Sequence, residues 1–289
     1  MENGNIFKKA CLLQLSSSVW EGSRMIESGL MESLGQPSEW VKAKKKLVNP
    51  ELLGPIKTAV HQARNHILKH ALPFPITSLH LIPKEALNET DDTLRHYKDR
   101  FWEKVREFEA NYAYAREEAR AVLGDLFNET DYPDDIAKKF NFEWRFLTLD
   151  VPAKTSVLPP EVYQREKEKF QSLMEETRTM ASAAMAKELS EVVEQLTEKL
   201  SGNKKTLNGS MLNKLKDFLD AFETRNLFQD ERLTEIVAQA KAIVGGVTPY
   251  GLRYNEAMRE KISQDMSGLK TAIDAAIEDL PRRKIRLAA

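Results

Sequence analysis

One unbroken helical stretch constrains the fold of this chain more than any other feature of its sequence. Residues 161–200 contain neither proline nor glycine, and their apolar residues recur every three or four positions. A helix of this length spans about 60 Å. The residues that keep the spacing are Phe170, Leu173, Thr177, Ala181, Ala184, Glu188, Val192, Leu196 and Leu200.

Two more segments predict long helices. The first runs from about residue 83 or 91 to 123, with a nearly continuous apolar stripe from Leu94 to Val122, and Gly124 is a plausible terminator. The second covers about 253–279, where the mean apolar step of about 3.7 favours straight or slightly right-handed packing. Helices this long need a partner surface, which each other or a second copy of the chain can supply. The sequence leaves both alternatives open.

The remaining elements are shorter. Asn49 and Pro50 have the form of a helix start, and proline clusters and glycines separate the later segments. We expect a strand or mixed structure over 10–20, helices over 50–71, 131–140, 210–225 and 230–244, strands over 76–82 and 142–148, and a flexible loop over 245–251. The prediction is a mainly α protein of long antiparallel helices, as a helical bundle or coiled-coil hairpin, with a small mixed α+β N-terminal part. Its regions are 1–150, mixed α+β with one long helix, and 160–289, a long-helix region with a basic tail.

Charge is balanced overall but uneven along the chain. With 43 Lys plus Arg against 44 Asp plus Glu, the net charge is −1, which excludes a chain that acts as a polyelectrolyte throughout. Two clusters could still contact phosphates, and they make nucleic-acid binding in replication or recombination the alternative function. They are Lys42, Lys44, Lys45 and Lys46 after Trp40, and Arg282, Arg283, Lys284 and Arg286 after Pro281. Solvated surface lysines and a solvated helix end explain the same residues without any ligand.

No motif in the chain indicates catalysis. The sequence contains neither a P-loop, nor a GxGxxG fingerprint, nor a GxSxG elbow, nor an HExxH zinc motif. His66 and His70 have metal-ligand spacing on a helix, but capping or surface histidines explain them better. We therefore expect no catalytic residue, no metal and no cofactor, and a protein that is not an enzyme.

The compartment follows from cysteine usage and hydropathy. Cys11 is the single cysteine, so an internal disulfide is excluded, and its apolar neighbours favour a buried, inert thiol. No segment approaches the ~18 uncharged apolar residues of a membrane span. The expectation is a cytoplasmic protein without membrane contact.

Several segments together resemble the DUF3150 family of phage- and plasmid-borne bacterial proteins. They are Val19–Arg24 (VWEGSR), Leu47–Lys57 (LVNPELLGPIK), Phe108 with Asn111 and Tyr112, and the aromatic alternation from Phe142 to Phe146. The resemblance covers roughly the first 150 residues. Glu21 stands where the family tends to have serine.

The resemblance implies a role with a partner, because members are often encoded near MoxR-like AAA+ ATPases and von Willebrand A-type proteins. It carries over no catalytic residue. Trp20, Arg24 and Trp40 are the candidate partner-binding residues, and Trp20 and Arg24 are spaced to stack as a cation–π pair. Trp20 could equally anchor a core. The leading hypothesis is a non-enzymatic helical scaffold or adaptor of a mobile genetic element that binds proteins or self-associates; an inhibitor of a host system is a further alternative.

Overall fold

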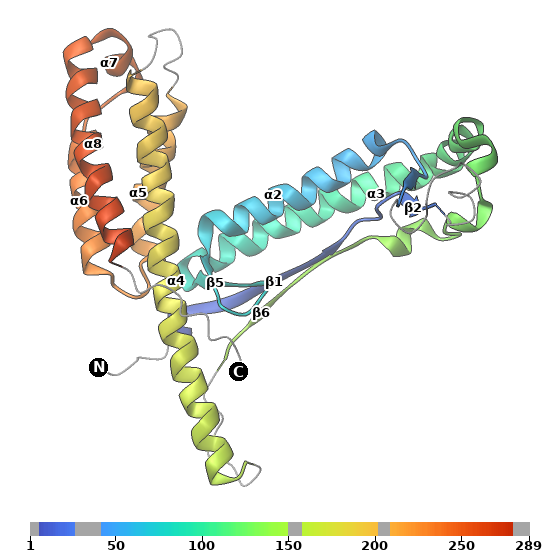
Figure 1. Cartoon of the computed structure of the whole chain (residues 1–289), viewed down its shortest axis with the longest axis horizontal. Helices are drawn as coiled ribbons and strands as arrows, with labels where there is room; N and C mark the ends of the chain where they lie inside the picture. Colours follow the sequence, from blue (N-terminus) through green and yellow to red (C-terminus); the bar gives the residue numbers. More distant parts are fainter. Residues whose placement is uncertain (1–5, 27–41, 150–157, 202–208, 280–289) are drawn as a thin grey trace. The chain divides into compact units, whose positions relative to one another are not determined.

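The computed structural model describes residues 6–26, 42–149, 158–201 and 209–279 (Figure 1). These residues form a mainly α protein with seven α-helices and a small sheet, as the sequence predicts. The α-helices are α2 (Gly54–His70), α3 (Leu87–Leu123), α4 (Pro160–Ser201), α5 (Ser210–Arg225), α6 (Glu231–Val244), α7 (Pro249–Tyr254) and α8 (Glu256–Glu278). None of these helices is long and apolar enough to cross a bilayer.

The strands are short and belong to two sheets. A four-stranded sheet has the order β4-β5-β1-β6, from β1 (Ala10–Ser18), β4 (Leu72–Pro73), β5 (Leu79–Pro83) and β6 (Asn141–Leu147). A two-stranded antiparallel ribbon pairs β2 (Ser23–Met25) with β3 (Lys44–Lys46). The six 3₁₀ turns are η1 (Ile6–Lys8), η2 (Pro50–Leu53), η3 (Lys84–Ala86), η4 (Gly124–Leu126), η5 (Glu129–Asp131) and η6 (Ile136–Lys139).

The chain divides into two compact units, and both are discontinuous in sequence. The bundle unit contains residues 1–13, 70–87 and 146–289, and the hairpin unit contains residues 14–69 and 88–145. These ranges differ from the regions 1–150 and 160–289 because two N-terminal segments pack with the C-terminal helices. Strand β1 contributes residues 10–13 to the bundle unit and residues 14–18 to the hairpin unit.

Helices α4, α5, α6 and α8 form the bundle unit's core, and α4 makes its most extensive contact with α8. The apolar stripes of these helices therefore meet within one chain. The buried core includes Met185, Leu189, Leu196, Leu215, Leu219, Ile236, Val237, Met266, Leu269 and Ile273, joined by Leu12, Leu72 and Leu81 from the sheet. The first turns of α4 contribute no fully buried residue before Met174.

The hairpin unit is built from α2 and α3, which lie side by side (Figure 1) and are joined by a hydrogen bond from Arg100 Nη1 to Gln62 Oε1. The helices and β6 enclose an aromatic core in which Phe101 contacts Phe140 and Phe142 at ring-centroid distances of 6.4 and 5.4 Å. Gly124, at φ +51°, ends α3 in the left-handed conformation typical of a helix terminus.

Three predictions of local structure are wrong. The segment over 253–279 is two helices, because Asn255 leaves the helical conformation and its Oδ1 accepts the amide of Met258 at 3.0 Å as the N-cap of α8. Part of the expected loop over 245–251 is the helix α7, which Thr248 caps. The expected helix over 131–140 is instead the turns η5 and η6, with Pro133 between them.

Candidate functional site

Segments that resemble the DUF3150 family meet at the β2–β3 ribbon of the hairpin unit. The indole of Trp20 lies 6.2 Å from the Phe108 ring and 5.9 Å from the Tyr112 ring, measured between centroids. Gly22 is packed so closely that a Cβ there would lie 2.9 Å from Leu53 Cδ1. Gly22 also has a φ of +61°, which favours glycine. We call these residues beside the ribbon, Trp20, Gly22, Leu53, Phe108 and Tyr112, the motif cluster.

Charged side chains fix the other side of the motif cluster. Lys45 Nζ lies 2.6 Å from Asp131 Oδ2, and both side chains are nearly buried, at 11% and 9% exposure. Oδ2 has no aligned hydrogen-bond donor, so the contact is an ion pair. Lys45 also donates to the carbonyl of Leu126 at 2.7 Å. Arg24 approaches the same carboxylate at 3.5 Å but is 68% exposed.

Arginine and tyrosine side chains extend the cluster along α3. Arg116 forms an ion pair with Glu129 and lies over the rings of Tyr112 and Tyr132, at 5.9 and 5.6 Å from their centroids. Burial raises the pKa of Tyr112 to about 12 and also raises the pKa of Tyr132. The two hydroxyls are buried and protonated at neutral pH, so neither tyrosine is an ionised nucleophile.

The structure separates the four lysines that the sequence groups together. Lys44 and Lys46 are exposed in β3. Lys45 lies on the opposite side of the strand, where its amino group forms an ion pair with Asp131. Lys42 is exposed, and Lys44 lies 3.6 Å from Glu21. Lys45 is thus unavailable to a phosphate, because side chains alternate along a strand. The basic tail residues Arg282, Arg283, Lys284 and Arg286 lie outside the described residues.

The predicted partner-binding residues have different surroundings. Trp20 is half-buried against Phe108 and Tyr112, which is the anchoring role. Arg24 is paired with Asp131, and within the described segments the structure does not bring Arg24 and Trp20 together as a cation–π pair. Trp40 lies in the stretch 27–41, which the structure does not describe.

An exposed pair of tyrosines in the bundle unit was not singled out from the sequence. Tyr250 and Tyr254 on α7 are 72% and 68% exposed, and their rings contact each other with centroids 4.6 Å apart. Their spacing of four residues places them on one helix face, which is the signal that could have identified them. Leu252, buried to 2% exposure, anchors the same short helix.

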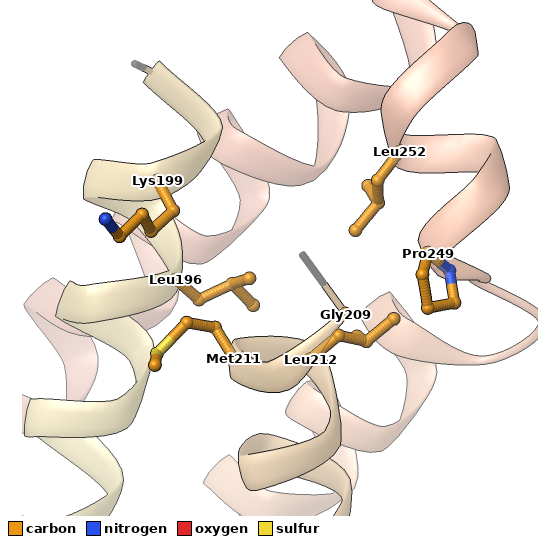
Figure 2. A pocket seen from close by; sticks show the side chains of 7 residues that line it. All are labelled: Leu196, Lys199, Gly209, Met211, Leu212, Pro249 and Leu252. Carbon is orange, nitrogen blue, oxygen red and sulfur yellow. The ribbon is translucent and has the colours of Figure 1, made fainter. Parts of the chain in front are cut away.

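The hollows of the bundle unit range from a space for one water to an open groove on the surface. One lies between α4, α5 and α7, and its space of about 10 Å³ holds at most one water. Leu196, Leu212 and Leu252 line it, and the amino group of Lys199 points away from them (Figure 2). A second hollow, of about 140 Å³, lies at Asp230, Arg232 and Asp279. An open groove of about 530 Å³ follows the α5–α6 turn.

Potential metal ligands do not gather in the part of the chain that the structure describes. No group of three or more histidine, cysteine or carboxylate side chains in it is placed to hold a metal ion. The carboxylate of Asp274 has a lowered pKa because it accepts hydrogen bonds from Lys270 and then from Ser190. This arrangement ties α8 to α4 and leaves the carboxylate ionised.

A comparison with family models identifies the protein family of the chain. The model described as "Protein of unknown function (DUF3150)" matches residues 7–251, and thus most of both units. The chain belongs to the DUF3150 family. The match extends beyond the roughly 150 residues that carry the sequence resemblance, through α4, α5 and α6 and into α7 of this DUF3150 protein. Searches of curated proteins and of solved structures found no match.

Proposed function

We propose that this DUF3150 protein is a non-enzymatic helical adaptor that binds another protein through the bundle unit. The observation that carries the proposal is the exposed pair of Tyr250 and Tyr254 on α7. Large aromatic side chains supply much of the binding energy in protein interfaces, and tyrosine is enriched at the residues that contribute most. A contacting pair of rings, each more than two-thirds exposed, suits such a contact.

The tyrosine pair is held in place before any partner arrives. Thr248 caps α7, with its hydroxyl accepting the Gly251 amide at 3.0 Å. A Cβ at Gly251 would lie 3.0 Å from Met258 Sδ, so α7 packs tightly on α8. Because the backbone of α7 is already fixed, binding a partner would restrict only side chains. The entropic cost of binding is therefore lower.

The family resemblance suggests the class of partner. MoxR-like AAA+ ATPases and von Willebrand A-type proteins are the proposed partners, and a role in a phage or plasmid is the proposed setting. Self-association through the same tyrosines is the other form of the adaptor, and occupation of a host protein's surface would make it an inhibitor. All three readings require the exposed pair to become buried in a complex.

Affinity capture from the native host with the tagged full-length chain tests the proposal. Nuclease treatment of half the sample separates protein partners from nucleic-acid tethers. We expect Tyr250→Ala/Tyr254→Ala to reduce recovery of the partner at least tenfold. Tyr114→Ala is the matched control, because Tyr114 is 76% exposed on α3 in the other unit.

Size-exclusion chromatography with light scattering completes the test. A dimer that the double substitution dissociates would assign the tyrosines to self-association. A monomer that captures no protein, or a partner recovered equally by both variants, would overturn the adaptor proposal.

A further inference from the structure

Helix α2 lies in a stretch of the chain without a single carboxylate side chain. Residues 52–84 contain no Asp or Glu, although the whole chain has 44 in 289 residues, so a segment of average composition would hold about five. Within this stretch α2 carries Lys57, Arg64 and Lys69 together with three histidines. The neutral charge of the whole chain conceals this local excess.

Helix α2 buries one apolar side and exposes a side that is mostly polar, with Leu68 as an apolar residue among the exposed ones. Its buried side consists of Ile56, Ala59, Val60, Ala63 and Ile67, which pack into the hairpin unit. Its exposed side carries Lys57, Thr58, His61, Arg64 and Asn65, which we call the α2 basic face. The positions 57, 61 and 64 recur every three or four residues, so their side chains form a single row along the helix.

The positive charges of this face lack acidic partners. Arg64 Nη2 donates to the hydroxyl of Ser17 at 3.0 Å, and no carboxylate among the described residues lies within 4 Å of Lys57 or Arg64. Arg100 of α3 lies beside the face and donates to the amide oxygen of Gln62. Its charge is likewise not neutralised by an ion pair in the described segments. Three cationic groups therefore remain available to an anionic ligand.

We propose that the α2 basic face, with Arg100 beside it, binds the phosphate backbone of a nucleic acid. Lysine, arginine, threonine and asparagine are the side chains that contact phosphate and sugar in nucleic-acid complexes. A membrane-surface helix would need a broad apolar face toward the lipid, but the apolar side of α2 is buried. The largest exposed apolar side chain of the helix is Leu68, at 58% exposure. A partner helix would similarly need a row of apolar anchors.

The dimensions of the face suit contacts along one strand. Lys57 and Arg64 are seven residues apart, or about 10.5 Å along the helix axis. One strand of duplex DNA carries a phosphate for each ~3.4 Å of its axis, so the row spans about three phosphates. Contacts of this kind do not read sequence. Binding should weaken as the salt concentration rises. If Lys57, Arg64 and Arg100 each contact one phosphate, a plot of log affinity against log salt concentration should have a slope of about −3.

Fluorescence anisotropy with the full-length chain tests the proposal. The probes are fluorescein-labelled 30-nucleotide single-stranded DNA, the corresponding duplex and an RNA of the same sequence, at 50 to 200 mM NaCl. We expect wild-type protein to bind at least one probe at 50 mM NaCl. Lys57→Glu/Arg64→Glu should weaken binding at least tenfold and reduce the salt slope by about 2.

The matched control reverses two charges elsewhere. Lys214 and Lys261 are exposed on α5 and α8, and Lys214→Glu/Lys261→Glu changes the net charge by the same amount. This control should bind as wild type does. Circular dichroism should show that both variants keep the wild-type helix content, because all four side chains are exposed.

Three outcomes would overturn the proposal. They are no binding of any probe at 50 mM NaCl, equal weakening by the two double variants, and capture of the chain by phosphatidylserine vesicles but not by nucleic acid. The result is independent of the adaptor proposal, because Tyr250→Ala/Tyr254→Ala should leave the anisotropy unchanged. Loss of protein capture and loss of nucleic-acid binding would therefore be traced to different substitutions.

Discussion

At the scale of single residues, identical side chains have different roles that depend on the side of the strand on which they lie. Lys44 and Lys45 are neighbours in β3, yet one is solvated and the other is nearly buried against Asp131. A run of identical residues hides the alternation of a strand, so no pattern of residue types in 44–46 could reveal it. The absence of Asp and Glu from residues 52–84 can be found in the sequence by counting.

The Lys45–Asp131 pair gives a prediction about stability. Lys45→Ala leaves the buried Asp131 carboxylate with only the more distant Arg24, and we expect a loss of about 2 to 3 kcal/mol in the free energy of unfolding. Lys44→Ala should change it by less than about 0.5 kcal/mol, because its pair with Glu21 is solvated. Urea unfolding of both variants measures the difference. Equal losses would show that the buried pair has no special role.

The single cysteine gives a prediction about pH. Burial raises the pKa of Cys11 to about 11, so the folded state holds the thiol proton that the unfolded state loses near its ordinary value of 9.0. The stability contributed by this difference is therefore lost as pH rises from about 9 toward 11. At pH 8.5 we expect iodoacetamide to alkylate the folded protein at least about tenfold more slowly than the urea-unfolded protein. Equal rates would indicate an accessible thiolate.

At the scale of elements, the apolar periodicity predicts long helices well and predicts their interruptions poorly. Helix α4 has the predicted length, because no residue within 161–200 competes with the helix. Asn255 interrupts an equally regular stripe, since its side chain can satisfy the first amides of a new helix. Periodicity reports only which face is buried. The polar residue that ends one helix and begins the next lies outside the stripe.

The cap between α7 and α8 can be tested directly. Asn255→Ala removes the acceptor for the Met258 amide, and we expect a loss of about 1 kcal/mol in the free energy of unfolding. Asn255→Asp is the control, because aspartate caps equally well and should remain within about 0.5 kcal/mol of wild type. Thermal and urea unfolding monitored by circular dichroism measure both. An alanine variant as stable as wild type would mean that the cap contributes nothing at this junction.

At the scale of the whole molecule, the two units have separate cores and can be observed separately. All four tryptophans fall within the sequence ranges of the hairpin unit, so tryptophan fluorescence reports on that unit. Helices α4 to α8 belong to the bundle unit and dominate the far-ultraviolet circular dichroism. The sequence indicates the mainly helical class and the motif segments, whereas the division into units depends on which distant segments pack together, and local patterns do not encode that.

Substitutions in the two cores should therefore affect different signals. Phe101→Ala empties a fully buried position of the hairpin unit, and we expect it to destabilise the fluorescence-detected transition by about 3 to 5 kcal/mol. Phe222→Ala, in the bundle core, should instead shift the transition detected by circular dichroism. Parallel urea titrations of both variants make the comparison. Identical shifts in both signals for both variants would show that the units unfold as one.

Because the units are discontinuous in sequence, the ribosome completes the hairpin unit before it completes the bundle unit. Every residue of the hairpin unit has emerged from the ribosome once position 145 has left the exit tunnel. Leu12, Leu72 and Leu81 emerge before that point, but the helices that cover them are translated only afterwards. Nascent chains of intermediate length therefore display an apolar sheet surface that the finished protein hides. Such chains are natural clients for a chaperone that binds near the tunnel.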